Sequence, residues 1–257
     1  MQSISRYVFL SLCLLCAAWS AQASVVLSNT RVIYDGKEKE VSVKLENQGK
    51  APALVQVWMD TGDMDAPPSM VDVPFTVTPP MTRIEAGKSQ TLRMTYVKEE
   101  NNKALLDDRE SIFWLNVLEI PKKSTDAEQA PSGMQLAYRT RVKVFYRPVK
   151  MEGRGQKQYE ATGKVTWKLA EVDGKVTLTA TNPTPYHVSY AKIIVKFGEN
   201  EIPIEGLNGM VRPHASQTFV LSDMKQLPTG AVQVQYDTIT DVGGAEAGEY
   251  TINQAAK

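Results

Sequence analysis

The chain has 257 residues, and its 29 Lys and Arg residues balance 29 Asp and Glu residues, so the formal net charge at pH 7 is zero. A neutral chain argues against binding nucleic acid or another polyanion through bulk charge. The length is enough for one large β domain or for two domains of ordinary size.

The first 23 residues are predicted to be a secretory signal and not part of the fold. Arg6 supplies a positive start, an apolar run follows, and Ala21-Gln22-Ala23 matches an A-x-A cleavage site. The apolar run is too short to span a bilayer. We therefore expect the mature protein to begin near Ser24 and to lie outside the cytoplasm.

Both cysteines, Cys13 and Cys16, lie within this signal. The mature chain is therefore expected to contain no disulfide. A secreted protein without disulfides must be held together by its hydrophobic cores, which two domains of ordinary size can supply.

Short runs of alternating apolar and polar residues, rich in Val, Thr, Tyr and Ile, recur along the rest of the chain and predict β-strands. In chain order they span residues 24–35, 40–47, 51–60, 90–97, 111–120, 136–148, 163–172, 175–182, 191–198, 216–222 and 231–237. Asp-Gly steps at 35–36 and 173–174 predict turns. Roughly seven strands on either side of Pro148 predict an all-β protein made of immunoglobulin-like sandwiches.

The boundary between two domains is predicted just after Pro148, where Gly153 and Gly155 loosen the chain. This gives an N-terminal domain over 24–148 and a C-terminal domain over 149–257. Within the first domain, the polar segment 121–133 is bounded by Pro and Gly and is predicted to be a mobile loop.

The strand after this loop has two unlike faces. Its even positions carry Leu136, Tyr138, Val142 and Val144, and its odd positions carry Arg139, Arg141, Lys143 and Arg147. Charge at a sheet edge resists aggregation, which is one interpretation of Arg139 and Arg141. The other is an acidic partner or an anionic chain terminus beside the strand, because charge-assisted hydrogen bonds are about twice as strong as neutral ones. Composition does not choose between them.

Catalytic motifs are missing from the sequence: there is no G-x-S-x-G, H-E-x-x-H, P-loop or dinucleotide fingerprint. With two histidines and no cysteine in the mature chain, a transition-metal site is not expected. His187 and His214 are expected at surface or turn positions. The segment 60–65, "DTGDMD", suggests calcium, but Val71 stands where the bidentate Glu of a calcium loop is required, so a solvated turn is expected. We predict neither an enzyme nor a cofactor.

Several segments together resemble the PapD-like chaperones of the chaperone–usher pathway, which fold and deliver pilus subunits. The resemblance rests on "DDRESIFWLNVLEIP" (107–121) with "VKVFYRP" (142–148), on "LSNTRVIYDG" (27–36), on "TPPMTRIEAGKSQTLRM" (78–94) and on "TNPTPYHVS" (181–189). It covers essentially the whole chain from Ser24. It implies a periplasmic, non-enzymatic chaperone of two immunoglobulin-like domains that meet in an L.

The resemblance also implies roles for particular residues. Arg31 and Lys143 would lie between the domains and anchor the C-terminal carboxylate of a subunit. Met134, Leu136 and Tyr138 would fill the gap in an incomplete subunit sandwich, which is donor-strand complementation. Glu110, Arg147 and Asp241 would form a salt bridge across the hinge and set the angle between the domains.

The implied partners are pilus or fimbrial subunits and an outer-membrane usher, and an unoccupied apolar edge also allows a self-capping dimer. The alternative interpretation is a secreted β-sandwich that is itself a structural or adhesive fimbrial component. A fimbrial subunit would carry its own N-terminal donor extension and usually one domain.

Overall fold

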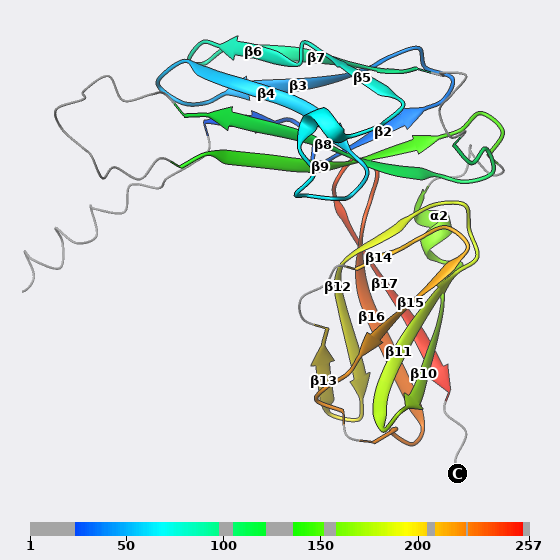
Figure 1. Ribbon diagram of the computed structural model, residues 1–257. Helices are drawn as coiled ribbons and strands as arrows, with labels where there is room; N and C mark the ends of the chain where they lie inside the picture. The colour runs from blue at the N-terminus through cyan, green and yellow to red at the C-terminus, as the bar shows by residue number, and fades with distance from the viewer. Residues whose placement is uncertain are drawn as a thin grey trace, which may run out of the picture.

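The computed structural model describes residues 24–97, 105–121, 136–151, 158–204, 209–224 and 226–253. The predicted signal and Met134 lie outside these residues, as does nearly all of the predicted loop 121–133. The described chain forms two β domains that meet in an L, with the first domain lying across one end of the second (Figure 1).

The first domain is a sandwich of two sheets. Its strands are β1 (Val25–Leu27), β2 (Arg31–Asp35), β3 (Val41–Asn47), β4 (Ala53–Asp60), β5 (Phe75–Thr78), β6 (Met81–Ile84), β7 (Ser89–Tyr96), β8 (Ser111–Ile120) and β9 (Tyr138–Arg147). One sheet has the order β1-β3-β7-β5 and the other β2-β9-β8-β4-β6. A short 3-10 helix, η1 (Pro68–Met70), lies in the connection between β4 and β5.

One predicted strand, 24–35, is divided between the sheets, and the segment between 60 and 90, for which no strand was predicted, adds β5 and β6. The first strand pairs with β3 as β1, crosses at the polar residues 28–30, and pairs in parallel with β9 as β2. Likewise β5 and β6 are separated by Pro79 and Pro80, whose nitrogens cannot donate to a sheet ladder. The segments therefore follow the pattern of an immunoglobulin-like sandwich.

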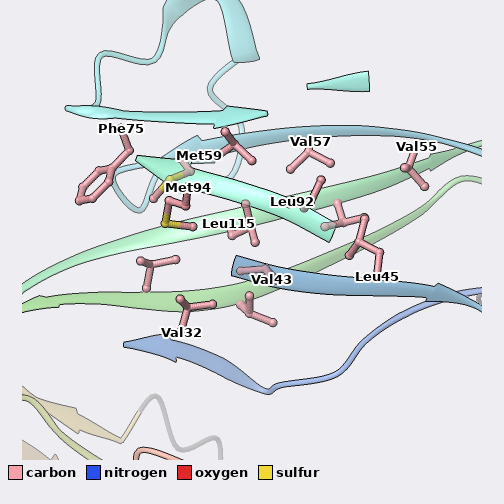
Figure 2. Packing of buried hydrophobic residues seen from close by; sticks show 14 of the residues in the cluster. Val32, Val43, Leu45, Val55, Val57, Met59, Phe75, Leu92, Met94 and Leu115 are labelled. Atoms are coloured by element: carbon pink, nitrogen blue, oxygen red, sulfur yellow. The ribbon is translucent and has the colours of Figure 1, made fainter. Parts of the chain in front are cut away.

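The core of the first domain lies between the two sheets, as Figure 2 shows for the residues it labels. In β3, Val43 and Leu45 are buried while Ser42 and Lys44 are exposed, so the period-two pattern places one face inside. At one end of this core an aromatic cluster joins Phe75, Tyr34 and Tyr146, with ring centroids 5.5 to 5.8 Å apart.

The second domain is a separate sandwich with its own hydrophobic cluster. It contains a short helix, α2 (Gln158–Thr162), and the strands β10 (Thr166–Val172), β11 (Lys175–Asn182), β12 (Val188–Phe197), β13 (Asn200–Pro203), β14 (Met210–Val211), β15 (Ala215–Val220), β16 (Ala231–Ile239) and β17 (Ala245–Asn253). One sheet has the order β10-β11-β15, the other β13-β12-β16-β17, and β14 pairs with β12. The predicted turn at Asp173 and Gly174 joins β10 to β11, and both residues have positive φ, as a tight hairpin turn requires.

The prediction of an all-β protein of two immunoglobulin-like sandwiches in an L is confirmed. The described part of the chain contains no helix that is long and apolar enough to cross a membrane.

Candidate functional site

The sheet that contains β9 has one face toward the core and one toward the second domain. Paired residues on neighbouring strands point to the same face. Val142 and Val144 of β9 point into the core. Phe145 and Arg147 point the other way and contact the second domain, because the Phe145 ring lies 5.5 Å from the His187 ring and Arg147 binds Asp241. We call this the inter-domain face. It also carries Arg139, Arg141 and Lys143.

Arg31 and Lys143 lie side by side on the inter-domain face, because they are paired residues of the parallel strands β2 and β9. Arg31 Nη1 donates a 3.0 Å hydrogen bond to the carbonyl of Ile239 in the second domain, and its guanidinium lies 5.5 Å from the centre of the Phe145 ring. Its Nε is buried and has no acceptor among the described residues. The arrangement places two cations next to each other where the domains meet.

Burial and mutual repulsion make this pair electrostatically costly. Burial lowers the pKa of Lys143, and the charge of Arg31 lowers it further. Burial also lowers the pKa of Arg31, although the charges of Asp241 and Glu110 partly oppose this. Within the described ranges, no carboxylate forms an ion pair with Lys143. Like charges on directly opposite residues are destabilising, so an anion that bound here would relieve the repulsion.

A second set of charges joins the two domains. Arg147 Nε donates to Glu110 at 2.6 Å, and its two terminal nitrogens each donate to one Asp241 oxygen at 2.7 Å. The other Glu110 oxygen accepts the backbone N–H of His187 at 2.7 Å and lies 3.1 Å from its ring Nδ1. Burial alone would lower the pKa of Arg147, but its hydrogen bonds and the two carboxylates raise it. The structure thus brings Glu110, Arg147 and Asp241 together.

The first half of β9 has one open edge. Among the described residues, 143–146 pair with β2 on one side and with β8 on the other, whereas 138–142 pair only with β8. Leu136 is 59% exposed and Tyr138 is 36% exposed. Both have the same parity as Val142 and Val144, so the apolar row continues the core face beyond the part of β9 that the sandwich covers. Met134, the third predicted member of the row, lies outside the described residues.

Arg141 is paired within the first domain. Its charge is therefore explained neither by protection of a sheet edge nor by an acidic partner or anionic chain terminus beside the strand. Arg141 binds Asp60 through Nε at 3.0 Å and through Nη2, and its guanidinium lies 4.7 Å from the centre of the Trp114 ring. Asp60 is 2% exposed and also accepts from Asn116 at 2.7 Å. The expectation of a solvated turn is therefore wrong for Asp60, although Asp63 and Asp65 are exposed. The described residues contain no cluster of His, Cys, Asp and Glu that could hold a metal ion.

The histidine prediction is right for one residue and wrong for the other. His214 is exposed in a turn with φ of 51°. His187 is 3% exposed, because Glu110 binds both its backbone and its ring and Phe145 lies beside it. The inter-domain joint therefore contains a buried histidine that the sequence did not indicate.

The side chains that contact Arg139 and Arg141 were not predicted from the sequence. Trp58 and Asp60 alternate with the core residues of β4, and Trp114 and Asn116 do so on β8. Applying the period-two rule to those strands would have placed them on the same face as Arg141. Their contacts with one another depend on the register between strands, which the pattern of a single strand does not provide.

Two family models match the chain. Residues 24–152 match the N-terminal domain of the pili and flagellar-assembly chaperone PapD, and residues 160–250 match the C-terminal domain of the pili assembly chaperone PapD. The probable fimbrial chaperone YadV of Escherichia coli strain K12 is 41% identical over 237 residues, which are 91% of this chain and 92% of YadV.

Solved structures show the same architecture. The crystal structure of the YadV chaperone has a TM-score of 0.73 and 37% identity, and the match covers 90% of this chain and all of that one. The structure of the Salmonella enterica SafA pilin in complex with the SafB chaperone has a TM-score of 0.69 and 26% identity, and the match covers 91% and 98% of the two chains. The chain therefore belongs to the PapD family of pilus-assembly chaperones and is a fimbrial chaperone.

Proposed function

We propose that this chaperone acts in the periplasm and binds a pilus or fimbrial subunit by donor-strand complementation. The observation that carries the proposal is the open edge of β9 at residues 138–142, beside the exposed Leu136 and Tyr138. An edge of this kind can add a strand through backbone hydrogen bonds, while alternate side chains enter the partner's core. A subunit that lacks one strand exposes a matching edge, which would otherwise aggregate.

In this proposal Arg31 and Lys143 bind the C-terminal carboxylate of the subunit. They lie where β2 begins to pair with β9, so the open edge ends at two adjacent cations. A carboxylate would satisfy the buried Arg31 Nε and would counteract the burial and the repulsion by Arg31 that lower the pKa of Lys143. It would also fix the register of the added strand, and with it which subunit residues face the core of the chaperone.

The bridge of Glu110, Arg147 and Asp241 is assigned a separate role, which is to set the orientation of the second domain. Arg147 contributes three charge-assisted hydrogen bonds, two of them to a residue of the other domain. The planar guanidinium fixes the direction of both carboxylates, which a lysine could not do. The angle between the domains in turn positions Arg31 through its bond to Ile239.

Delivery to an outer-membrane usher completes the proposed pathway. Strand exchange would release the subunit, so the reaction needs neither a nucleotide nor another cofactor. In the absence of a subunit, the open edge of β9 could pair with the same edge of a second copy and form a self-capping dimer. Sedimentation velocity would show a monomer–dimer equilibrium that Leu136→Asp shifts toward monomer, and a single monomeric species at high concentration would contradict the dimer.

The proposed binding of the subunit carboxylate by Arg31 and Lys143 is tested with one neutral substitution of similar shape at Lys143 and with a matched control. Tagged wild-type chain, Lys143→Met and Lys44→Met are expressed in the periplasm of a fimbriated strain, and the co-purifying subunit is identified by mass spectrometry and then produced for titration. Lys44 lies on β3 with its side chain 53% exposed, so its loss should have no effect. Lys143→Met should weaken subunit binding by about 10- to 100-fold, the value of a hydrogen bond to a charged group. Equal affinities for all three proteins would refute the anchor.

A further inference from the structure

The connection after β4 is held flat against the inter-domain face at its start. Asp60, the last residue of β4, is bound by Arg141 and accepts the backbone N–H of Gly62 at 2.6 Å. A Cβ atom on Gly62 would lie 3.1 Å from the Trp114 ring, and Gly62 has φ of 122°. Only glycine suits both the close approach and this backbone conformation, so the position of the connection is built into the sequence.

The same connection is tied to the open half of β9. The carbonyl of Met64 accepts a 2.9 Å hydrogen bond from Arg139 Nη1, and the Arg139 guanidinium lies 5.8 Å from the centre of the Trp58 ring. Arg139 belongs to the residues that pair only with β8. In Figure 1 the connection that carries η1 crosses the β8 and β9 strands. Residues 61–65, the Met64 loop, are therefore fixed beside the open edge.

The Met64 loop presents an apolar side chain on this fixed backbone. Met64 is 55% exposed, although its carbonyl is bonded and its neighbours are held by Asp60 and Trp114. Methionine is unbranched and polarisable, so it adapts to differently shaped apolar surfaces and is common on surfaces that bind several partners. A rigid backbone with one adaptable apolar tip is suited to contacting related but non-identical proteins.

We propose that the Met64 loop is a second contact for the bound subunit. The inference rests on the proposed function, because it requires a subunit strand at the open edge of β9. Such a strand would lie about 5 Å from β9. Its side chains on the inter-domain face would then lie next to Arg139 and within reach of Met64. The loop thereby extends the subunit interface from the edge of the sheet onto its face, and the two arginines of β9 hold it there.

Site-specific photo-crosslinking tests the occupant. Met64, Leu136 and Met81 are each replaced by p-benzoylphenylalanine in full-length chain expressed in the periplasm of a fimbriated strain, and the products formed on irradiation are identified by mass spectrometry. Met81 is the matched control, because it is 52% exposed and lies on β6 at the far end of the same sheet. We expect positions 64 and 136 to cross-link to the subunit and position 81 not to.

The other outcomes separate the two proposals. Cross-linking at position 136 without cross-linking at 64 would overturn the second contact and leave donor-strand binding intact. No subunit product at either position would count against the proposed function itself. A position-64 product with twice the mass of the chain would assign the loop to a second copy and refute the subunit as its occupant.

The contribution of Met64 to subunit binding is measured with Met64→Ser, and Met81→Ser is the control. Loss of part of a buried methionine side chain should speed dissociation of the subunit roughly three- to tenfold for Met64→Ser. Met81→Ser should dissociate at the wild-type rate. Equal dissociation rates for wild type and both variants would overturn the proposal even if cross-links formed. A cross-link shows only that the subunit is near Met64, whereas the proposal requires that Met64 contributes to binding.

Discussion

Removal of the Arg147 guanidinium is the perturbation with the largest predicted effect on the joint between the domains. In Arg147→Leu, Glu110 would keep its hydrogen bonds to His187 but lose its cationic partner while only 4% exposed. Breaking a buried ion pair by removing one partner costs about 3–5 kcal/mol, because a buried charge is left uncompensated. Asp241 is about a third exposed, with 32% side-chain accessibility, so water compensates it in part.

A matched control is available in Arg83, whose Nε lies 2.8 Å from Glu85 on the surface, with both side chains more than half exposed. Arg83→Leu removes a pair of similar geometry and should change the free energy of unfolding by less than about 1 kcal/mol. The assay is urea unfolding followed by tryptophan fluorescence, since Trp58 and Trp114 report on the first domain and Trp167 on the second.

Small-angle X-ray scattering of the same proteins provides the second measurement. If the bridge sets the orientation of the domains, Arg147→Leu should increase the radius of gyration under conditions where both domains remain folded, and Arg83→Leu should not. Unfolding at the wild-type urea concentration together with an unchanged scattering profile would refute the reasoning, because it would mean that the joint does not depend on this ion pair.

Three further predictions concern single positions. Burial raises the pKa of Tyr146 to about 12 from 10.0, so the stability that this tyrosine contributes is complete below pH 10 and is lost as pH rises to 12. Tyr146→Phe should therefore be more resistant than wild type to unfolding between pH 10 and pH 12. Equal resistance of the two proteins in a pH-jump fluorescence assay would count against this. Gly62→Ala should lower the urea midpoint by the equivalent of about 1–3 kcal/mol, because the added carbon would crowd the Trp114 ring and because Gly62 has a positive φ. An unchanged midpoint would contradict the packing of the Met64 loop. Leu136→Asp should abolish co-purification of the subunit while leaving the unfolding midpoint unchanged, since Leu136 is exposed, and Val220→Asp, at 52% exposed, is its control.

Much of the fold follows from patterns within single strands. The alternation in β9 predicts its two faces, because the period of a strand is fixed by backbone geometry. The hairpin at Asp173 and Gly174 follows from the φ values that these residue types tolerate. The alternative of a structural or adhesive component of the fimbria is not supported by the comparisons, which identify chaperones.

The missed features all depend on contacts between segments far apart in the chain. Nothing in "TPYHVS" indicates that His187 is buried, because its partner Glu110 lies in the other domain. The same is true of Asp60, which resembles a turn carboxylate until the register of β9 brings Arg141 to it. Local sequence determines which face a side chain occupies, whereas packing determines its neighbours.

Amide hydrogen exchange along β9 tests the central claim most directly. In the free chain, residues 143–146 lie between β2 and β8, whereas residues 138–142 have a neighbouring strand on one side only among the described residues. Binding of the co-purified subunit should slow exchange at those amides of 138–142 that do not bond to β8, and should leave exchange at 143–146 nearly unchanged. A subunit that binds without altering exchange at 138–142 would contradict donor-strand complementation by this chain.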